Sequence, residues 1–177
     1  FIRKNDEFTV NIALMDNGIP VLGVVHTPAL DMTHYAASGG GAFKSSGAQV
    51  ALPIQCRKFA ADNAVMVASR SHSGAAVEHY RTELSKITSN LQTRSMGSAL
   101  KVCLVAEGEA DIYPRLGLTS EWDTGASHCI INEAGGKLVN MQGGPLQYNK
   151  ESILNPWFLA IGDATIDWLQ FLPEDAV

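Results

Sequence analysis

Residues 8–14 alternate between larger apolar side chains and smaller or polar ones with the two-residue period of β-strands. The apolar members of the first run are Phe8, Val10, Ile12 and Leu14. A second run over residues 21–25 follows the tripeptide Asp16-Asn17-Gly18, and Asn-Gly is the strongest short-range signal for a tight hairpin. The pattern therefore predicts a β-hairpin over residues 8–26 and a third strand over residues 32–37.

Three consecutive glycines, Gly39, Gly40 and Gly41, follow the third predicted strand. A phosphate-binding loop would continue into Gly-Lys-Ser or Gly-Lys-Thr and then a helix, and neither follows here. The glycines therefore predict a turn between strands of a meander.

The pattern changes between residues 50 and 62, where short mixed segments give way to alternating strands and helices. We place a domain boundary there, which predicts an antiparallel sheet domain over residues 1–60 and an α/β domain over residues 61–177. The strands expected in the second part are 65–68, 110–114, 137–140 and 157–161. The expected helices are 75–88, 98–107, one starting at Asp123, and a closing helix over 164–172.

Composition narrows the classes of protein. The formal charge of −5 provides no basic field that would attract nucleic acid or an anionic membrane, so neither partner is expected. No apolar stretch approaches the ~20 residues of a membrane-spanning helix. The three cysteines, Cys56, Cys103 and Cys129, form no C-x-x-C pair, so we interpret them as buried thiols in a reducing cytoplasm. We expect a cytoplasmic protein, with no visible anchor for peripheral association with the inner membrane.

The segment EWDTGASHCIINEAGG, residues 121–136, carries the strongest chemical signal. Asp123 stands at the start of a predicted helix that Gly135 and Gly136 end. Small residues after Asp123 would let a metal or ligand approach the backbone, and the helix start favours an anion. An aspartate before a helix also acts as a simple cap, so the residue has two interpretations.

Three further polar groups follow predicted elements of the second part. The sequence SRSH, residues 69–72, comes directly after a predicted buried strand, where α/β folds place binding groups. Ser98 and Lys101 are three residues apart at a predicted helix start, which suits a phosphate or, alternatively, a capping serine with a solvated lysine. Arg115 ends a predicted strand, where its planar guanidinium suits bidentate phosphate contact or a surface ion pair.

The pattern W-D-x followed by three small residues and then E-A-G-G closely resembles the second signature of the inositol monophosphatase superfamily of magnesium-dependent, lithium-sensitive phosphatases. The resemblance implies a layered αβαβα sandwich, with this chain supplying part of it. It also implies that Asp123 ligates one of the catalytic Mg²⁺ ions. Relatives usually have Ala-Ala-Gly where this chain has Gly125, Ala126 and Ser127.

Within the superfamily, SRSH, GS-x-LK-x-C-x-VAEG-x-AD-x-YPR and the WD signature together resemble the bacterial 3'(2'),5'-bisphosphate nucleotidases of the CysQ type. Such enzymes convert adenosine 3',5'-bisphosphate, a by-product of sulfate activation, to AMP and phosphate. The resemblance implies that the nucleotide and the phosphate that is not cleaved are held by His72, Ser98, Lys101 and Arg115. Asp123 would then hold metal beside the phosphate that is cleaved.

The same resemblance indicates that this chain lacks the first metal-binding signature of the family. Residues 1–10 are similar to the segment that directly follows the first metal-binding signature, D-P-x-D-G-T, of these nucleotidases. We therefore expect an N-terminally truncated chain that lacks most metal ligands, is inactive alone, exposes apolar sheet surface, and is completed by an N-terminal half. An inositol monophosphatase or a sugar bisphosphatase of the same superfamily remains an alternative substrate class. A noncatalytic nucleotide- or anion-binding fragment is the alternative of another class.

Overall fold

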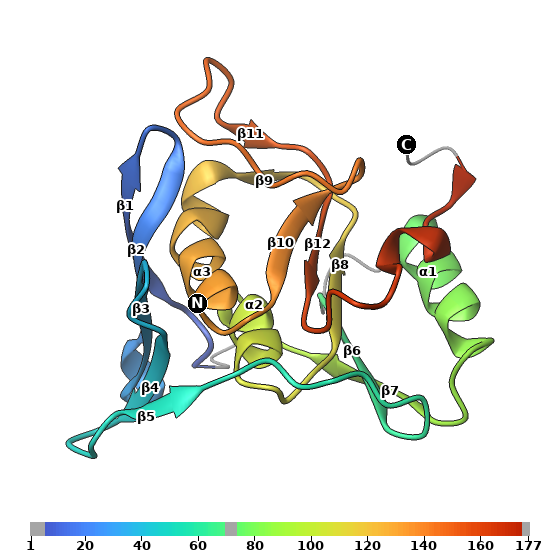
Figure 1. Ribbon diagram of the computed structural model, residues 1–177, viewed down its shortest axis with the longest axis horizontal. Helices are drawn as coiled ribbons and strands as arrows, with labels where there is room; N and C mark the ends of the chain where they lie inside the picture. Colours follow the sequence, from blue (N-terminus) through green and yellow to red (C-terminus); the bar gives the residue numbers. More distant parts are fainter. Residues whose placement is uncertain (1–5, 70–73, 175–177) are drawn as a thin grey trace.

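The computed structural model describes residues 6–69 and 74–174 and arranges them in four layers, visible from left to right in Figure 1. The first layer is a five-stranded antiparallel meander, here called sheet A, whose strands are hydrogen-bonded in chain order. Its strands are β1 (Val10–Asp16), β2 (Ile19–Thr27), β3 (Met32–Ala37), β4 (Ala42–Ser46) and β5 (Leu52–Ile54).

The predicted hairpin and third strand are confirmed. Asn17 and Gly18 join β1 to β2 with φ angles of 49° and 77°, the left-handed pair that a tight hairpin turn requires. The three glycines form the turn between β3 and β4, as expected. The carboxylate of Glu133 accepts hydrogen bonds from the backbone amides of Gly39 and Gly41, at 3.1 and 2.9 Å, and so fixes this turn to helix α3 (Glu121–Glu133).

The second sheet, sheet B, is mixed, with the strand order β10-β12-β8-β6-β7. Strand β6 pairs in parallel with β7 and β8, whereas β12 pairs antiparallel with β8 and β10. The five strands are β6 (Ala64–Ala68), β7 (Leu91–Ser95), β8 (Ile112–Arg115), β10 (Lys137–Asn140) and β12 (Phe158–Ile161). A separate two-stranded ribbon joins β9 (Thr119–Ser120) to β11 (Leu154–Asn155).

Helices fill the space between the sheets and cover the far face of sheet B (Figure 1). Helices α2 (Leu100–Ala106) and α3 lie between the sheets, while α1 (Ala75–Ser85) and the 3₁₀ helix η2 (Trp168–Phe171) lie on the other side of sheet B. Another 3₁₀ turn, η1 (Pro28–Leu30), joins β2 to β3. Sheet B therefore separates two apolar clusters, one shared with α2, α3 and sheet A and one shared with α1 and η2.

Helix α3 approaches sheet A unusually closely. A Cβ added at Gly23 would lie 2.1 Å from the carbonyl oxygen of Ala126, and one added at Gly125 would lie 2.5 Å from Cε of Met15. The lack of a side chain at Gly125 and at Gly23 is therefore needed for the packing of α3 against β1 and β2. The expectation that the small residues after Asp123 also admit a ligand stays a prediction.

Sheet A has two apolar faces, and the described helices cover only one. Residues Asn11, Ala13 and Met15 of β1 face α3, whereas Val10, Ile12 and Leu14 point away from it and are 49%, 59% and 58% exposed. The pairing places Leu22, Val24, Tyr35 and Phe43 on the same outer face, where they line an open hollow of about 360 Å³. This is the exposed apolar sheet surface that the sequence predicts.

Several predicted element bounds are corrected. Helix α2 begins at Leu100 instead of residue 98, and the closing helix predicted over 164–172 is only the four-residue η2. The chain turns at Asp163, whose Oδ1 accepts hydrogen bonds from the Thr165 amide and hydroxyl. The 3₁₀ helix begins only after Asp167, its N-cap residue, whose side chain accepts a hydrogen bond from the Leu169 amide. The domain division at residue 60 stays a prediction, and α3 packs directly on sheet A.

Candidate functional site

Lys101 extends from the first turn of α2 and is 8% exposed, so it is not the solvated lysine of the alternative interpretation. Its Nζ donates a 2.8 Å hydrogen bond to the Ser98 carbonyl and lies 5.5 Å from the centre of the Tyr113 ring. Burial, and then the positive charge of Arg115, lower the pKa of Lys101 to about 8, against the opposing effects of Glu7 and Asp123. The charges of Arg115, Glu7 and Asp123 therefore all act on the ammonium group of Lys101.

Arg115 ends β8 beside Tyr113 and interacts with the phenol of that residue. Its Nη2 donates a 2.8 Å hydrogen bond to the Leu118 carbonyl. Its Nε is buried and has no hydrogen-bond partner within the described residues. An unpaired guanidinium N–H next to a buried ammonium suits an anion with several oxygens, such as a phosphate.

Asp123 lies in the first turn of α3, at its third position, and not at the cap. Ser120 is the N-cap residue, and its backbone amide donates a 2.8 Å hydrogen bond to Oδ2 of Asp123, which forms a capping box. The carboxylate is exposed to solvent, yet its charge acts on both Lys101 and Tyr113. Asp123 therefore stabilises its helix and also acts electrostatically on Lys101.

A buried polar network holds the first turn of α3 in place. Nδ2 of Asn155 donates to Oγ1 of Thr124 at 3.0 Å and to the Ser120 carbonyl at 2.8 Å. The Tyr148 hydroxyl contacts Oγ1 of Thr124 at 3.3 Å and Nδ1 of His128 at 2.8 Å. Burial lowers the pKa of His128 to about 4, so the imidazole is neutral at physiological pH. This network fixes the backbone that carries Asp123.

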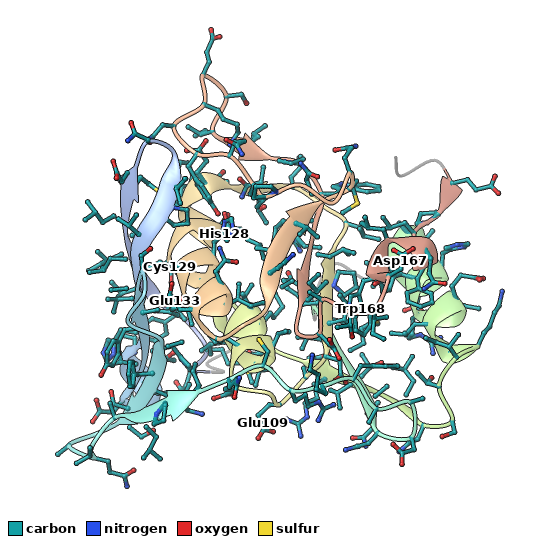
Figure 2. The ribbon with its side chains drawn as sticks, viewed as in Figure 1. Glu109, His128, Cys129, Glu133, Asp167 and Trp168 are labelled. Atoms are coloured by element: carbon teal, nitrogen blue, oxygen red, sulfur yellow. The ribbon has the colours of Figure 1, made fainter. Side chains whose placement is uncertain are left out.

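Helix α3 continues from this turn to the predicted glycine stop. Figure 2 shows Cys129 and Glu133 on the side of α3 that faces sheet A, with His128 on another side. The amides of Gly135 and Gly136 donate to the carbonyls of Asn132 and Ile131, and Gly135 has a φ of 88°. This is a Schellman ending, which the paired glycines of the sequence predict correctly.

The structure corrects the helical position predicted for Ser98, while its predicted role in substrate binding stays a prediction. Ser98 precedes α2, has a φ of 47°, and does not cap the helix, whose N-cap is Ala99. Its carbonyl accepts the Lys101 hydrogen bond while its side chain is exposed. The predicted pairing of hydroxyl and ammonium on one helix face is therefore wrong, because this turn has a left-handed residue where a helical one was expected.

Two other residues complete the account of the site. His72 lies outside the described residues, so its predicted role stays a prediction. Glu7 was not among the predicted site residues, but its carboxylate lies close to Gly97, where an added Cβ would be 2.8 Å from Oε2. It also acts on the charge of Lys101. No signal within the sequence itself indicates this contact, which joins residues 90 positions apart.

Two other carboxylates of the second part, Asp111 and Glu121, have structural roles. Asp111 is buried and accepts hydrogen bonds from Nε and Nη2 of Arg57, at 2.8 and 2.6 Å, and from the Val65 amide at 2.7 Å. Glu121 binds Lys150 and the amides of Asn149 and Lys150. Within residues 6–69 and 74–174, no group of three or more His, Cys, Asp or Glu side chains is placed to hold a metal ion. Asp123 can supply one oxygen ligand of the several that Mg²⁺ requires.

These features define a layered fold of two sheets and intervening helices, and the comparisons identify its family. Residues 1–160 match the model of the inositol monophosphatase family, and the chain belongs to that family. The chain is 46% identical over 159 residues to the 3'(2'),5'-bisphosphate nucleotidase CysQ of Escherichia coli K12, covering 89% of this chain and 61% of that protein. It is 36% identical to the CysQ protein of Haemophilus influenzae, covering 95% of this chain and 62% of that protein.

Solved structures agree with this assignment. CysQ from Bacteroides thetaiotaomicron, described as a bacterial member of the family, superimposes with a TM-score of 0.83 at 41% identity over 92% of this chain and 65% of that one. An inositol monophosphatase from Zymomonas mobilis shares the fold with a TM-score of 0.77 at 22% identity, over 97% of this chain and 64% of that one. The predicted fold class is therefore confirmed. The chain spans less than two thirds of the length of these relatives.

None of the helices in the described part of the chain combines the length and apolar character needed to cross a membrane.

Proposed function

We propose that this chain is part of a 3'(2'),5'-bisphosphate nucleotidase that hydrolyses adenosine 3',5'-bisphosphate to AMP and phosphate with Mg²⁺. The observation that carries the proposal is the convergence of a buried lysine, an arginine with an unpaired N–H and an exposed aspartate at one site. The similarity to CysQ proteins supports the choice of a nucleotide bisphosphate over an inositol or sugar phosphate.

The proposed roles follow from charge and position. Lys101 and Arg115 hold the phosphate that is retained, and Ser98 and His72 contribute to holding the nucleotide. Asp123 supplies one oxygen ligand to Mg²⁺, which when bound offsets the negative charge on the phosphate that is cleaved. Fixing the retained phosphate at a separate cationic site orients the second phosphate toward Asp123.

The remaining metal ligands are proposed to come from an N-terminal half that precedes this chain in the complete polypeptide. Two observations support this part of the proposal: the described residues include no group of three or more His, Cys, Asp or Glu side chains placed to hold a metal ion, and the outer face of sheet A is apolar and uncovered by them. The isolated chain is then expected to bind the nucleotide and hydrolyse nothing, while the complete, cytoplasmic enzyme releases phosphate and is inhibited by lithium.

Calorimetric titration of the 177-residue chain with adenosine 3',5'-bisphosphate, with and without Mg²⁺, tests whether Lys101 and Arg115 bind the retained phosphate. Lys101→Ala and Arg115→Ala should each weaken binding by roughly tenfold to a hundredfold, the usual effect of losing a hydrogen bond to a charged group. Arg94→Ala is the matched control, because Arg94 is exposed and pairs with Glu109 at 2.8 Å. An equal loss of nucleotide affinity in all three variants would contradict the assignment of Lys101 and Arg115 to phosphate binding.

The same titration, together with an activity assay of an extended chain, distinguishes the proposed nucleotidase from a noncatalytic nucleotide-binding protein. A noncatalytic nucleotide-binding protein would bind with an affinity that does not depend on Mg²⁺, and extending the chain at its N-terminus would add no turnover. Tighter binding of inositol 1-phosphate than of the nucleotide bisphosphate would instead favour the inositol monophosphatase alternative.

A further inference from the structure

A single side-chain amide joins the two-stranded ribbon to the start of α3. Asn155, on β11, is 4% exposed, and its Nδ2 donates to the Ser120 carbonyl at 2.8 Å and to Oγ1 of Thr124 at 3.0 Å. A carbonyl can only accept hydrogen bonds, so the amide nitrogen of Asn155, and not its oxygen, must face Ser120. Asn155 therefore holds two positions of the turn that carries Asp123, although they lie 35 and 31 positions away in the sequence.

Ser120 links Asn155 to the carboxylate of Asp123. Asn155 binds the carbonyl of Ser120, while the backbone amide of Ser120 donates to Oδ2 of Asp123 at 2.8 Å. One carboxylate oxygen of Asp123 is thereby committed to the backbone, and the other, Oδ1, is outside this bond. Carboxylates that ligate a metal are commonly oriented by hydrogen bonds of this kind.

The hydroxyl of Thr124 uses its whole hydrogen-bonding capacity. Thr124 is 1% exposed, and its Oγ1 donates to the Glu121 carbonyl at 3.2 Å. The same oxygen accepts from Nδ2 of Asn155 at 3.0 Å and from the Tyr148 hydroxyl at 3.3 Å. A hydroxyl has one donor and two acceptor sites, so all three are occupied. Serine offers the same three sites, whereas valine has nearly the same shape as threonine and offers none.

We propose that Asn155 and Thr124 are positioning residues, which hold the first turn of α3 so that Oδ1 of Asp123 is presented to Mg²⁺. The inference rests on the proposed function, in which Asp123 is a metal ligand. Both side chains act through Ser120 and the backbone of α3. Without these bonds the carboxylate has to be ordered each time Mg²⁺ binds, and this cost weakens the affinity for the metal.

The first test measures the turn itself and needs neither metal nor substrate. In the 177-residue chain, hydrogen exchange should be followed by NMR at the backbone amides of Ser120 and Glu121, both of which are hydrogen-bonded. Asn155→Leu and Thr124→Val should each speed this exchange by at least ~10-fold, because each substitution leaves buried polar groups unpaired beside the turn.

Two control variants accompany this measurement. Thr124→Ser keeps the hydroxyl and should exchange as the wild-type chain does. Tyr80→Phe removes a buried 2.8 Å hydrogen bond to the Trp168 carbonyl, on the far side of sheet B. It should therefore lower stability without changing exchange in the first turn of α3.

The second test measures metal dependence in the complete polypeptide. The Mg²⁺ concentration for half-maximal phosphate release should rise by ~10- to 100-fold in Asn155→Leu and Thr124→Val, with a matching loss of Mg²⁺ affinity by calorimetry. Saturating Mg²⁺ should restore most of the rate. KM for the nucleotide should change little, because Lys101 and Arg115 hold the retained phosphate in the proposed function. Thr124→Ser should again resemble the wild type.

The outcomes separate this inference from the proposed function. Unchanged exchange at Ser120 and Glu121 in both variants would overturn the inference. An unchanged Mg²⁺ requirement in both variants, while Asp123→Asn is inactive, would also overturn it and leave the proposed function standing. Full, metal-independent turnover in Asp123→Asn would overturn the proposed function, and this inference with it, whatever the exchange measurement showed.

Discussion

Sheet B is buried on both faces, whereas the described helices cover sheet A on one face only (Figure 1). All five residues of β6 and all four of β12 are buried, while three apolar residues of β1 are about half exposed or more. Both sheets nevertheless carry apolar side chains on both faces. A sheet with two apolar faces is suited to lie between two layers, and the outer face of sheet A is the one that no described helix covers.

The largest expected effect is on the free energy of unfolding, when a side chain is truncated in each of the two sheets. Leu159→Ala, in the centre of sheet B, should lower the free energy of unfolding by about 2–5 kcal/mol, because it leaves a cavity in a closed core. Ile12→Ala, on the outer face of sheet A, should cost under about 1 kcal/mol, because that side chain is already in water. Urea unfolding of both variants measures the difference. Equal costs would mean that the face is covered in solution.

A second effect tests the connection between the sheets. Arg57→Ala should destabilise the chain by about 2 kcal/mol, because it removes two hydrogen bonds from the buried carboxylate of Asp111. Lys58→Ala is the neighbouring control, since Lys58 is 82% exposed where it pairs with Asp163, and its loss should cost under about 1 kcal/mol. Thermal unfolding of the pair checks this, and a cost for Lys58→Ala that matched Arg57→Ala would contradict it.

A third effect concerns the surface and leaves stability nearly unchanged. The double substitution Ile12→Lys and Leu14→Lys should reduce binding of the dye ANS and self-association several-fold, because it places two charges on the outer face of sheet A. Val50→Lys, at an exposed apolar residue outside the strands, is the control and should change neither. Dye fluorescence and sedimentation measure the outcome, and an equal response to the control would show that this face has no special role.

The smallest expected effect is the pH dependence of nucleotide binding. Lys101 has a pKa of about 8, so its charge is present below that pH and is lost as the pH rises through it. Affinity for adenosine 3',5'-bisphosphate should therefore fall between pH 7 and 9 in the wild-type chain. Lys101→Arg should bind with little change over this interval, because arginine keeps its charge. A titration series at several pH values decides the matter, and identical profiles for both chains would contradict the role of Lys101.

Local patterns predicted the regular elements well. Alternation and Asn17-Gly18 predicted β1 and β2, and the paired glycines after α3 predicted its end. Alternation did not show which face of β1 is buried, because both faces are apolar or small. Strands β4, β5 and β7 were not predicted: β5 contains Pro53, and the edge strand β7 is largely exposed and polar.

The candidate site was predicted less completely, since it depends on contacts between distant segments. Lys101, Arg115 and Asp123 were identified in the sequence, and the structure brings them together. The backbone at Ser98 and the approach of Glu7 to Gly97 depend on how α2 packs, which no local pattern encodes. The close packing of Gly125 on Met15 of sheet A is likewise a contact between distant segments that no local pattern shows.

The most direct test of the central claim is the role of Asp123 in the complete polypeptide. Phosphate release from adenosine 3',5'-bisphosphate should require Mg²⁺ and should fall by ~10³-fold or more in Asp123→Asn, since metal stabilisation of the transition state contributes several kcal/mol. Asp62→Asn, at an exposed carboxylate remote in sequence from the site, should keep full activity. Undiminished, metal-independent turnover in Asp123→Asn would contradict the assignment of this chain to a magnesium-dependent nucleotidase.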